Sequence, residues 1–218
     1  MDKIHCVHRL RPETLGPTSL VCPRCGQLGT FESVPNISDH ANLNTSNVLV
    51  GFFGLRRCPN EGCRLMVFLI RDQARRTIFQ FPPSRISFES KSVPENIVDT
   101  LKEAIECHAN KCDRAAAAMV RRTIEEICEN KNAQGGKLYE KIDDLKDKVI
   151  IAPALFDAMH NIRFLGNDAV HIELKWFDDV GPKEVAAAIK ITKKIIEAIY
   201  QADDLVKELE DLKTPSTP

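Results

Sequence analysis

The sequence predicts two domains, a small β domain in residues 1–90 and an all-α helical bundle in residues 91–218. Two observations carry this prediction. Short runs rich in β-branched and aromatic residues precede Pro82-Pro83, whereas after Lys91 the apolar residues recur every three or four positions, as on one face of a helix. The length of 218 residues also accommodates one ordinary domain and a small one, because domains most often span about 100–150 residues.

The β domain is predicted to begin with an extended lead-in, because residues 1–20 mix prolines and a glycine with no clear period. Strands are then predicted at Asn47–Leu55 and Leu65–Ile70, which flank the loop Cys58–Cys63 as the two arms of a hairpin would. A third strand is predicted at Thr77–Phe81, where the following prolines end it.

In the helical domain, the motif Ser92–Glu95 predicts a capping box at the start of a helix that runs to about Ala109. A second helix is predicted over Arg114–Asn130, with the Asp113 carboxylate as its cap. Later helices are predicted at Lys137–Lys148, from Pro153 toward His171, and along the apolar stripe Val185–Ile199 toward Leu212.

Four cysteines form two hooks with the spacing of metal ligands. Cys22 and Cys25 are separated by two residues, and Cys58 and Cys63 by four. Two such hooks can supply four thiolates to one tetrahedral Zn²⁺ ion, and glycines beside the sulfurs let backbone amides approach them. Four thiolates leave no place for water, so we expect one structural zinc ion per chain in a β zinc ribbon.

The other cysteines are interpreted differently. His5, Cys6 and His8 could replace a ligand or hold a second ion, but they have no paired hook nearby, and we place them outside the site. Cys107, Cys112 and Cys128 are interpreted as small core residues.

Arg163, Asn167 and His171 lie four residues apart and would form one polar ridge on a helix. Arginine can hold a phosphate, histidine can exchange a proton near neutral pH, and asparagine can orient either group. The alternative is a buried hydrogen-bond network in which Gly166 only permits close packing. Paired basic residues elsewhere are weaker candidates for phosphate contact, namely Arg75-Arg76, Arg121-Arg122 and Lys193-Lys194.

Composition and charge exclude other classes of protein. The chain is 43% hydrophobic and 28% charged, as in folded globular proteins and unlike disordered ones. No apolar run approaches the roughly 20 residues needed to cross a bilayer, and Met1–Arg11 lacks the apolar core of a signal peptide, so we expect a cytoplasmic protein. Residues 1–90 contain 11 Lys and Arg against 7 Asp and Glu, and residues 91–218 contain 19 against 24. Differences of this size are typical of solvated surfaces.

Three helical segments, Ala115–Glu125, Leu138–Leu145 and Arg163–His171, together resemble the HEPN-like domain found in bacterial restriction and phage-defence loci. With the four-cysteine ribbon in front, the chain is similar over nearly all of residues 20–200 to the ring-activated zinc-finger ribonucleases. HEPN ribonucleases place four to six residues between an arginine and a histidine. Arg163 and His171 have seven residues between them, and Phe164 stands where a polar residue is usual.

The resemblance implies a β zinc ribbon followed by an all-α HEPN-like bundle that acts as a metal-independent endoribonuclease of anti-phage defence. Arg163, Asn167 and His171 would be catalytic, and a phage component would activate an otherwise restrained enzyme. Two protomers would pair their active sites, so a homodimer is the minimum and a closed ring of dimers is compatible. The apolar stripe Val185–Ile199 is also expected to supply a face for this self-association. Two alternatives stay open, a catalytically silent HEPN-like sensor or adaptor and a zinc-ribbon nucleic-acid-binding oligomer.

Overall fold

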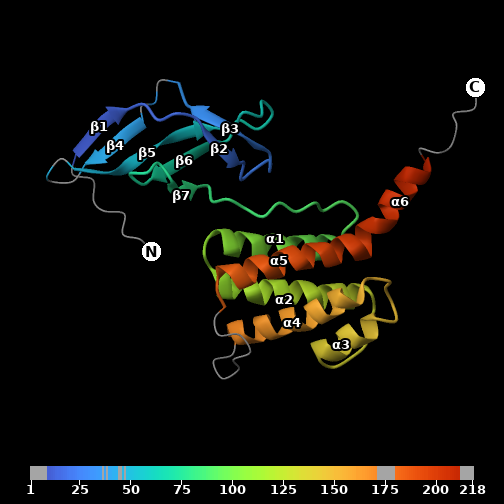
Figure 1. Cartoon of the computed structure of the whole chain (residues 1–218). Coiled ribbons are helices and arrows are strands. Elements are labelled where there is room, and N and C mark those ends of the chain that lie inside the picture. Colours follow the sequence, from blue (N-terminus) through green and yellow to red (C-terminus); the bar gives the residue numbers. More distant parts are fainter. Residues whose placement is uncertain are drawn as a thin grey trace, which may run out of the picture. The chain divides into compact units, whose positions relative to one another are not determined.

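The computed structural model describes residues 9–35, 37, 39–43, 46, 48–170 and 180–211. The chain divides into two compact units, Met1–Arg85 and Ile86–Pro218. The first unit is an antiparallel β-sheet and the second is all-α (Figure 1). The predicted fold class, a small β unit with four clustered cysteines followed by a helical bundle, is confirmed.

The N-terminal unit is a seven-stranded sheet in which every strand pair is antiparallel. Its strands are β1 (Arg9–Glu13), β2 (Thr18–Val21), β3 (Leu28–Ser33), β4 (Asp39–Leu43), β5 (Leu49–Arg57), β6 (Met66–Arg71) and β7 (Thr77–Phe81). The longest strand, β5, pairs with β4 and β3 on one edge and with β6 on the other. The sheet is extended by β1, which pairs with β4, by β2, which pairs with β3, and by β7, which pairs with β6.

The hairpin predicted around Cys58–Cys63 is present as β5 and β6, and β7 has the predicted bounds. The lead-in was predicted to be extended or loosely packed, without strands, and this needs correction because residues 9–13 and 18–21 form β1 and β2. These strands arise from pairing with distant segments, such as Arg11 opposite Ala41, and not from a local apolar period. Pro12 is tolerated because β1 pairs on one side only, and an edge strand can hold a residue that donates no hydrogen bond.

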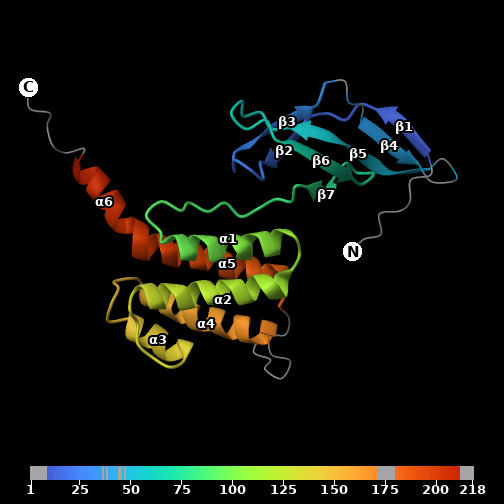
Figure 2. The ribbon, with the colours of Figure 1, turned by 180° about the vertical axis from the view of Figure 1, so that it is seen from behind.

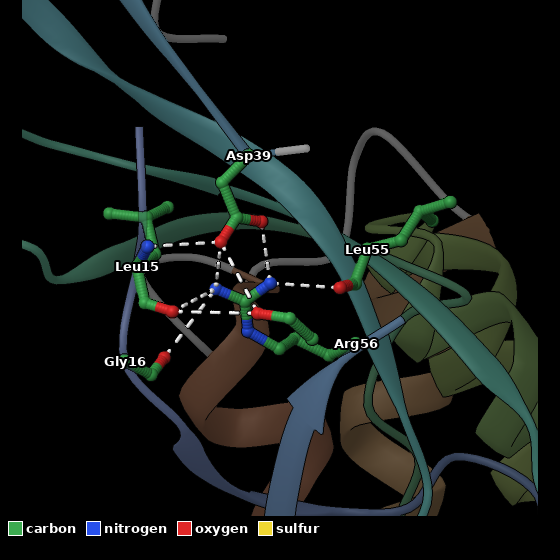
Figure 3. A network of polar contacts seen from close by, with 6 residues as sticks. Leu15, Gly16, Asp39, Leu55 and Arg56 are labelled. Atoms are coloured by element: carbon green, nitrogen blue, oxygen red, sulfur yellow. Dashed lines mark hydrogen bonds and ion pairs between the residues drawn. The ribbon is translucent and has the colours of Figure 1, made fainter. Parts of the chain in front are cut away.

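One face of this sheet is buried around an ion pair between Arg56 and Asp39 (Figure 3). The guanidinium donates to both carboxylate oxygens, from Nη1 at 2.7 Å and from Nη2 at 3.0 Å. The backbone of Leu15 closes the network, with its N–H 3.0 Å from the Asp39 carboxylate and its carbonyl accepting from Arg56. Gly54 leaves room for the Asp39 side chain, which a Cβ at that position would strike. This network ties the loop after β1 to the centre of the sheet.

The C-terminal unit contains α1 (Glu95–Ala109), α2 (Asp113–Asn130), α3 (Leu138–Leu145), α4 (Pro153–Val170), α5 (Pro182–Ile196), a π-helical turn (Glu197–Gln201) and α6 (Ala202–Asp211). Figures 1 and 2 show α2 between α1 and α4, and α2 also packs on α5. Fully buried Val120, Ile124 and Ile127 on α2 form the centre of the core. None of the described helices is long and apolar enough to span a bilayer.

Both predicted helix caps are wrong. Pro94 precedes α1 without a side-chain cap, and Ser92 has a φ of 62°, outside the geometry of a capping box. Cys112 occupies the cap position of α2, while the Asp113 carboxylate lies 2.9 Å from His108 Nδ1. Tertiary packing of the helices therefore stabilises these starts in place of the predicted caps.

The apolar stripe Val185–Ile199 lies inside the helical unit. Val185, Ile189 and Ile195 are fully buried, because α5 packs on α1, α2 and α4. This corrects the expectation that the stripe supplies a face for self-association. The helix continues through the π-helical turn into α6, which extends beyond the other helices (Figure 1).

Candidate functional site

The structure brings the four predicted ligand cysteines together. Their Sγ atoms all lie within 4.8 Å of one another, with Cys22 3.7 Å from Cys63 and Cys25 3.8 Å from Cys58. Four sulfurs arranged tetrahedrally at about 2.3 Å from a zinc ion are separated from one another by about 3.8 Å. The observed separations therefore fit a structural Zn²⁺ site with all four positions filled by protein.

Each cysteine hook is a tight turn closed by a backbone hydrogen bond and followed by a residue with positive φ. The N–H of Gly26 donates to the carbonyl of Cys22, and the N–H of Arg64 donates to Asn60. Gly26 and Arg64, each directly after the second cysteine of its hook, have φ values of 70° and 47°. The left-handed residue of the second hook is thus Arg64 and not the glycine within the loop. Both hooks follow strand ends, which explains how segments far apart in sequence meet.

The environment of the thiols favours ionisation of one of them. Burial opposes ionisation of Cys22, but hydrogen bonds from the backbone of Cys25 and Arg24 outweigh it and lower its pKa to about 7. Burial raises the pKa of Cys58 to about 12, and the pKa of Cys63 is also raised. In the metal-free cluster, the Cys22 thiol therefore ionises near neutral pH while the Cys58 thiol keeps its proton.

A second candidate site is a pocket of about 390 Å³ in the helical unit, between α2, α3 and α4. We call it the cationic pocket, because four basic side chains and one acidic side chain line it. Its lining residues are Arg121, Glu125, Gly136, Lys137, Leu138, Tyr139, Lys141, Arg163 and Asn167. Buried Ile142 and Leu145 hold α3 against the bundle, which places the first turn of α3 at the rim.

Arg121 organises the polar contacts of the cationic pocket. Its Nη1 donates to Asn167 Oδ1 at 2.8 Å and contacts the carbonyl of Arg163 at 3.5 Å. Its Nη2 lies 2.8 Å from Glu125 Oε1. Arg121 thus joins one carboxylate on its own helix to the amide and carbonyl oxygens presented by α4.

Arg163 has a different environment. Its guanidinium carbon lies 3.9 Å from the centroid of the Phe164 ring and 6.0 Å from that of Tyr139. Its Nε is buried without a hydrogen-bond partner, and none of the described carboxylates forms an ion pair with it. Burial lowers the pKa of Arg163 below its ordinary value, and the charge of Arg121 lowers it further. A cation held this way has unused donor capacity for an anion.

The structure describes two of the three residues of the predicted polar ridge. Arg163 and Asn167 both line the cationic pocket. His171, the third predicted residue, lies outside the described residues. Gly166 lies between Arg163 and Asn167 on α4, and a Cβ on Gly166 would lie 2.5 Å from Arg121 Cβ. The glycine therefore permits close packing of α2 and α4, as the alternative interpretation of the ridge predicts.

Sequence reasoning ranked Arg121 as a weaker candidate, although it is central to the pocket. The only local signal is its place on the alanine-rich helix, where small neighbours let another helix approach. The adjacent Arg122 is different: its side chain is 64% exposed and pairs with Glu126 at 3.0 Å. Among the other basic pairs, Arg76 pairs with Asp72 and Lys194 with Glu197.

The remaining metal-like residues do not form a further site in the described chain. The four hook cysteines are the only described cluster of three or more His, Cys, Asp or Glu side chains close enough to share an ion. Cys128 is buried in the core and Cys107 packs beside it, whereas Cys112 is exposed, so its prediction as a core residue is wrong. His5, Cys6 and His8 lie outside the described residues.

Comparison with known proteins places the helical unit in a family. A family model described as Domain of unknown function (DUF4145) matches residues 102–213, just over half of the chain. The match begins within α1, so it contains every residue of the cationic pocket and none of the β-sheet. No curated protein and no solved structure matches the chain.

Proposed function

The chain belongs to the DUF4145 family, and from the cationic pocket within its matched segment we propose that it is a metal-independent endoribonuclease. The observation that carries this proposal is the partly buried Arg163 guanidinium, which lines the same pocket as Arg121 and has an Nε without a hydrogen-bond partner. Two arginines that converge on one cavity suit the geometry of a phosphate group. The resemblance to HEPN-like ribonucleases supplies the reaction class, and a role in anti-phage defence follows from the same resemblance.

In the proposed reaction, the ribose 2′-hydroxyl attacks the adjacent phosphorus atom and the bond to the 5′-oxygen breaks. His171 accepts the proton of the 2′-hydroxyl, and Arg163 stabilises the negative charge on the phosphorane. Asn167 holds Arg121 through its amide oxygen and so keeps a second guanidinium at the pocket. The leaving 5′-oxygen takes a proton from water, so the products are a 2′,3′-cyclic phosphate and a 5′-hydroxyl. DNA lacks the attacking group and is not a substrate.

The four cysteines serve the stability of the ribbon in this proposal. A closed site of four thiolates has no open position for substrate, and the sulfur separations match one bound Zn²⁺ ion per chain. The N-terminal unit also buries only small apolar clusters, and metal binding can supply folding free energy that such a unit lacks. The zinc is therefore structural, and cleavage requires no other metal.

A second candidate function, a catalytically silent sensor or adaptor, is favoured by a specific observation. Arg121 already has protein partners for both terminal nitrogens, Asn167 and Glu125. Such a network can simply hold α2 against α4, and the seven-residue spacing between Arg163 and His171 departs from the HEPN pattern. In that case the pocket contributes to stability and not to chemistry.

RNA cleavage by the full-length zinc-loaded protein tests the first proposal. We expect cleavage in extracts of phage-infected cells that persists in EDTA, because a folded four-thiolate site exchanges its metal slowly. Arg163→Ala and His171→Ala should each reduce the rate by about a hundredfold or more, as loss of charge stabilisation or of a proton-transfer group does. The matched control is Arg122→Ala, which removes an exposed arginine next to the pocket and should cleave like the wild type.

The readouts separate the two candidate functions. Variants that lose cleavage while keeping their zinc content and melting temperature support the ribonuclease. Absence of cleavage by the wild type, with or without infected-cell extract, rules the ribonuclease out and leaves the sensor. Melting temperatures that fall for Arg163→Ala, with cleavage unchanged, would assign the ridge to packing.

A further inference from the structure

The second face of the β-sheet is apolar although it is not buried. Directly opposed residues in antiparallel strands share a face, so the pairing registers place His40, Phe53, Ile70 and Phe79 in one row across β4, β5, β6 and β7. A parallel row on the same face contains Leu55, Phe68 and Phe81. We call these two rows the aromatic face.

Burial differs sharply between the two sides of the sheet. On the other side, Ala41, Phe52 and Leu69 are buried, whereas every residue of the aromatic face is exposed or half-buried. Phe79 and Phe81 are 40% and 61% exposed. An antiparallel sheet with one buried face normally turns polar side chains to solvent on the other. A contiguous exposed apolar face therefore indicates a surface that binds something.

The rings of the aromatic face are arranged for stacking. His40 and Phe53 are nearly parallel, with centroids 5.5 Å apart and an angle of 15° between ring planes. Phe68 lies next to Phe53, with centroids 6.1 Å apart and ring planes tilted by 48°. Exposed rings in neighbouring strands of one sheet face offer a platform on which flat heteroaromatic ligands, such as nucleobases, can stack.

The charge of the unit favours an anionic ligand. Residues 9–85 contain ten arginines and no lysine, against five Asp and Glu. Eight of these arginines are exposed, and only Arg56 and Arg71 are buried. Arg57 lies on the same side as the aromatic face, two residues beyond Leu55 on β5, where it is opposite Glu32 of β3 and Met66 of β6. Arginine both binds phosphate and stacks on bases, so this composition complements a single-stranded polyanion with exposed bases.

We propose that the aromatic face binds the bases of single-stranded RNA, while nearby arginines contact the phosphates. Two independent features support this occupant, the ordered rings on one side of the sheet and the positive charge of the same unit. The choice of RNA over other single strands rests on the proposed ribonuclease function. Binding at the sheet would add affinity for unpaired RNA without requiring recognition of one base sequence, because every base has a face that can stack.

The test measures binding of the full-length protein to a fluorescent oligodeoxythymidylate and to an oligouridylate, each of about 12 nucleotides. The DNA probe lacks a 2′-hydroxyl, so its binding is read independently of any cleavage. We expect Phe79→Leu and Phe81→Leu to weaken binding of both probes by at least about fivefold, because leucine keeps the apolar volume but loses the stacking surface. Phe81→Trp should retain the wild-type affinity. Ile150→Ala is the control, because Ile150 is fully exposed and lies in the helical unit and not in the sheet.

Each result decides the proposal. Wild-type binding that is lost in the leucine variants and kept in Phe81→Trp supports it, even if no RNA is ever cleaved. No binding by the wild type, or leucine variants that bind like the wild type, overturns it. Leucine variants that keep their affinity for both probes but change the oligomer mass would instead assign the aromatic face to contacts between copies of the chain.

Discussion

At the scale of single residues, two thiols of the four-cysteine cluster, those of Cys22 and Cys58, differ in their readiness to ionise. Backbone hydrogen bonds lower the pKa of Cys22 to about 7, whereas burial raises that of Cys58 to about 12. A metal ion must therefore displace protons from some thiols and not from others. The same cluster is a weak ligand when protonated and a strong one when ionised.

The pH dependence of zinc binding follows from these pKa directions. Zinc lowers the pKa of Cys58 and Cys63 far below their metal-free values, so the stability it adds is present at high pH and lost as pH falls. Each thiol that is still protonated in the metal-free state weakens the apparent affinity by about tenfold per pH unit of acidification. We expect at least about a hundredfold weakening between about pH 7 and about pH 6. Competition with a chelating dye measures it, and an affinity independent of pH would contradict the thiolate site.

Gly166 on α4 packs closely against Arg121, a residue of the cationic pocket on α2. Alanine normally stabilises a helix relative to glycine by about 1 kcal/mol. Here the added Cβ would strike Arg121 Cβ at 2.5 Å and Cδ at 2.7 Å, so α2 and α4 must separate. We expect Gly166→Ala to lower the free energy of unfolding by about 1–3 kcal/mol, as overpacking does.

Chemical denaturation followed by helical circular dichroism measures this effect. Gly136→Ala is the matched control in the same unit, because its nearest contact would be an ordinary 3.6 Å to Glu140 Oε2. Its free energy of unfolding should stay within about 0.5 kcal/mol of the wild type. Equal destabilisation by both substitutions would show that the close approach of α4 to Arg121 is not the cause.

At the scale of secondary-structure elements, β5 and β6 depend on the loop that joins them. The loop contains Cys58 and Cys63, and the first hook brings β3 to the same cluster. Gly29 on β3 allows this approach, because a Cβ there would lie 2.6 Å from Pro59 Cγ. The small apolar cluster around Phe31 is completed by the buried cysteines themselves. The four-cysteine cluster and the core of this part of the sheet are thus one structure.

Replacing one ligand should therefore unfold the sheet and spare the helices. We expect Cys58→Ser to lose zinc and the hydrogen-exchange protection of β5 and β6, while α2 keeps its protection because its core is separate. Hydrogen-exchange mass spectrometry of the full chain reads both units at once. Cys112→Ser, an exposed cysteine of the helical unit, should keep both zinc and protection. Retention of zinc and of β5 protection in Cys58→Ser would remove this cysteine from the ligand set.

At the scale of the whole molecule, the surfaces available for self-association are not those that periodicity indicates. The apolar stripe along α5 is buried in the core of its own unit. On α6, by contrast, Val206 and Leu209 are more than half exposed and lie three residues apart, on one side of the helix. This helix extends beyond the rest of the bundle (Figure 1). It is a better candidate than α5 for contact with a second copy.

We expect the protein to be at least a dimer at micromolar concentration, as the resemblance to HEPN ribonucleases implies. Val206→Asp and Leu209→Asp should shift the mass toward the monomer, because each places a charge in an apolar contact. Light scattering measures the mass, and Glu208→Ala, on the opposite side of α6, is the control. A wild-type mass equal to that of one chain would contradict both the dimer and the pairing of active sites.

The sequence determined those features that short-range chemistry controls. Paired cysteine hooks specify their ligands by local spacing, and apolar residues at helical intervals specified α2, α4 and α5 closely. The hairpin of β5 and β6 was equally predictable, because two apolar runs flank one hook. In each case the signal lies within one element or its immediate turn.

Only the tertiary structure decided which of these features act together. β1 and β2 form by pairing with distant strands, and α1 and α2 begin without the caps their sequences offer, because packing stabilises them instead. The place of Arg121 in the cationic pocket depends on a glycine 45 residues away on α4. Likewise, alternation along a strand does not say which side is buried, so the aromatic face appears only once β4, β5, β6 and β7 are in register.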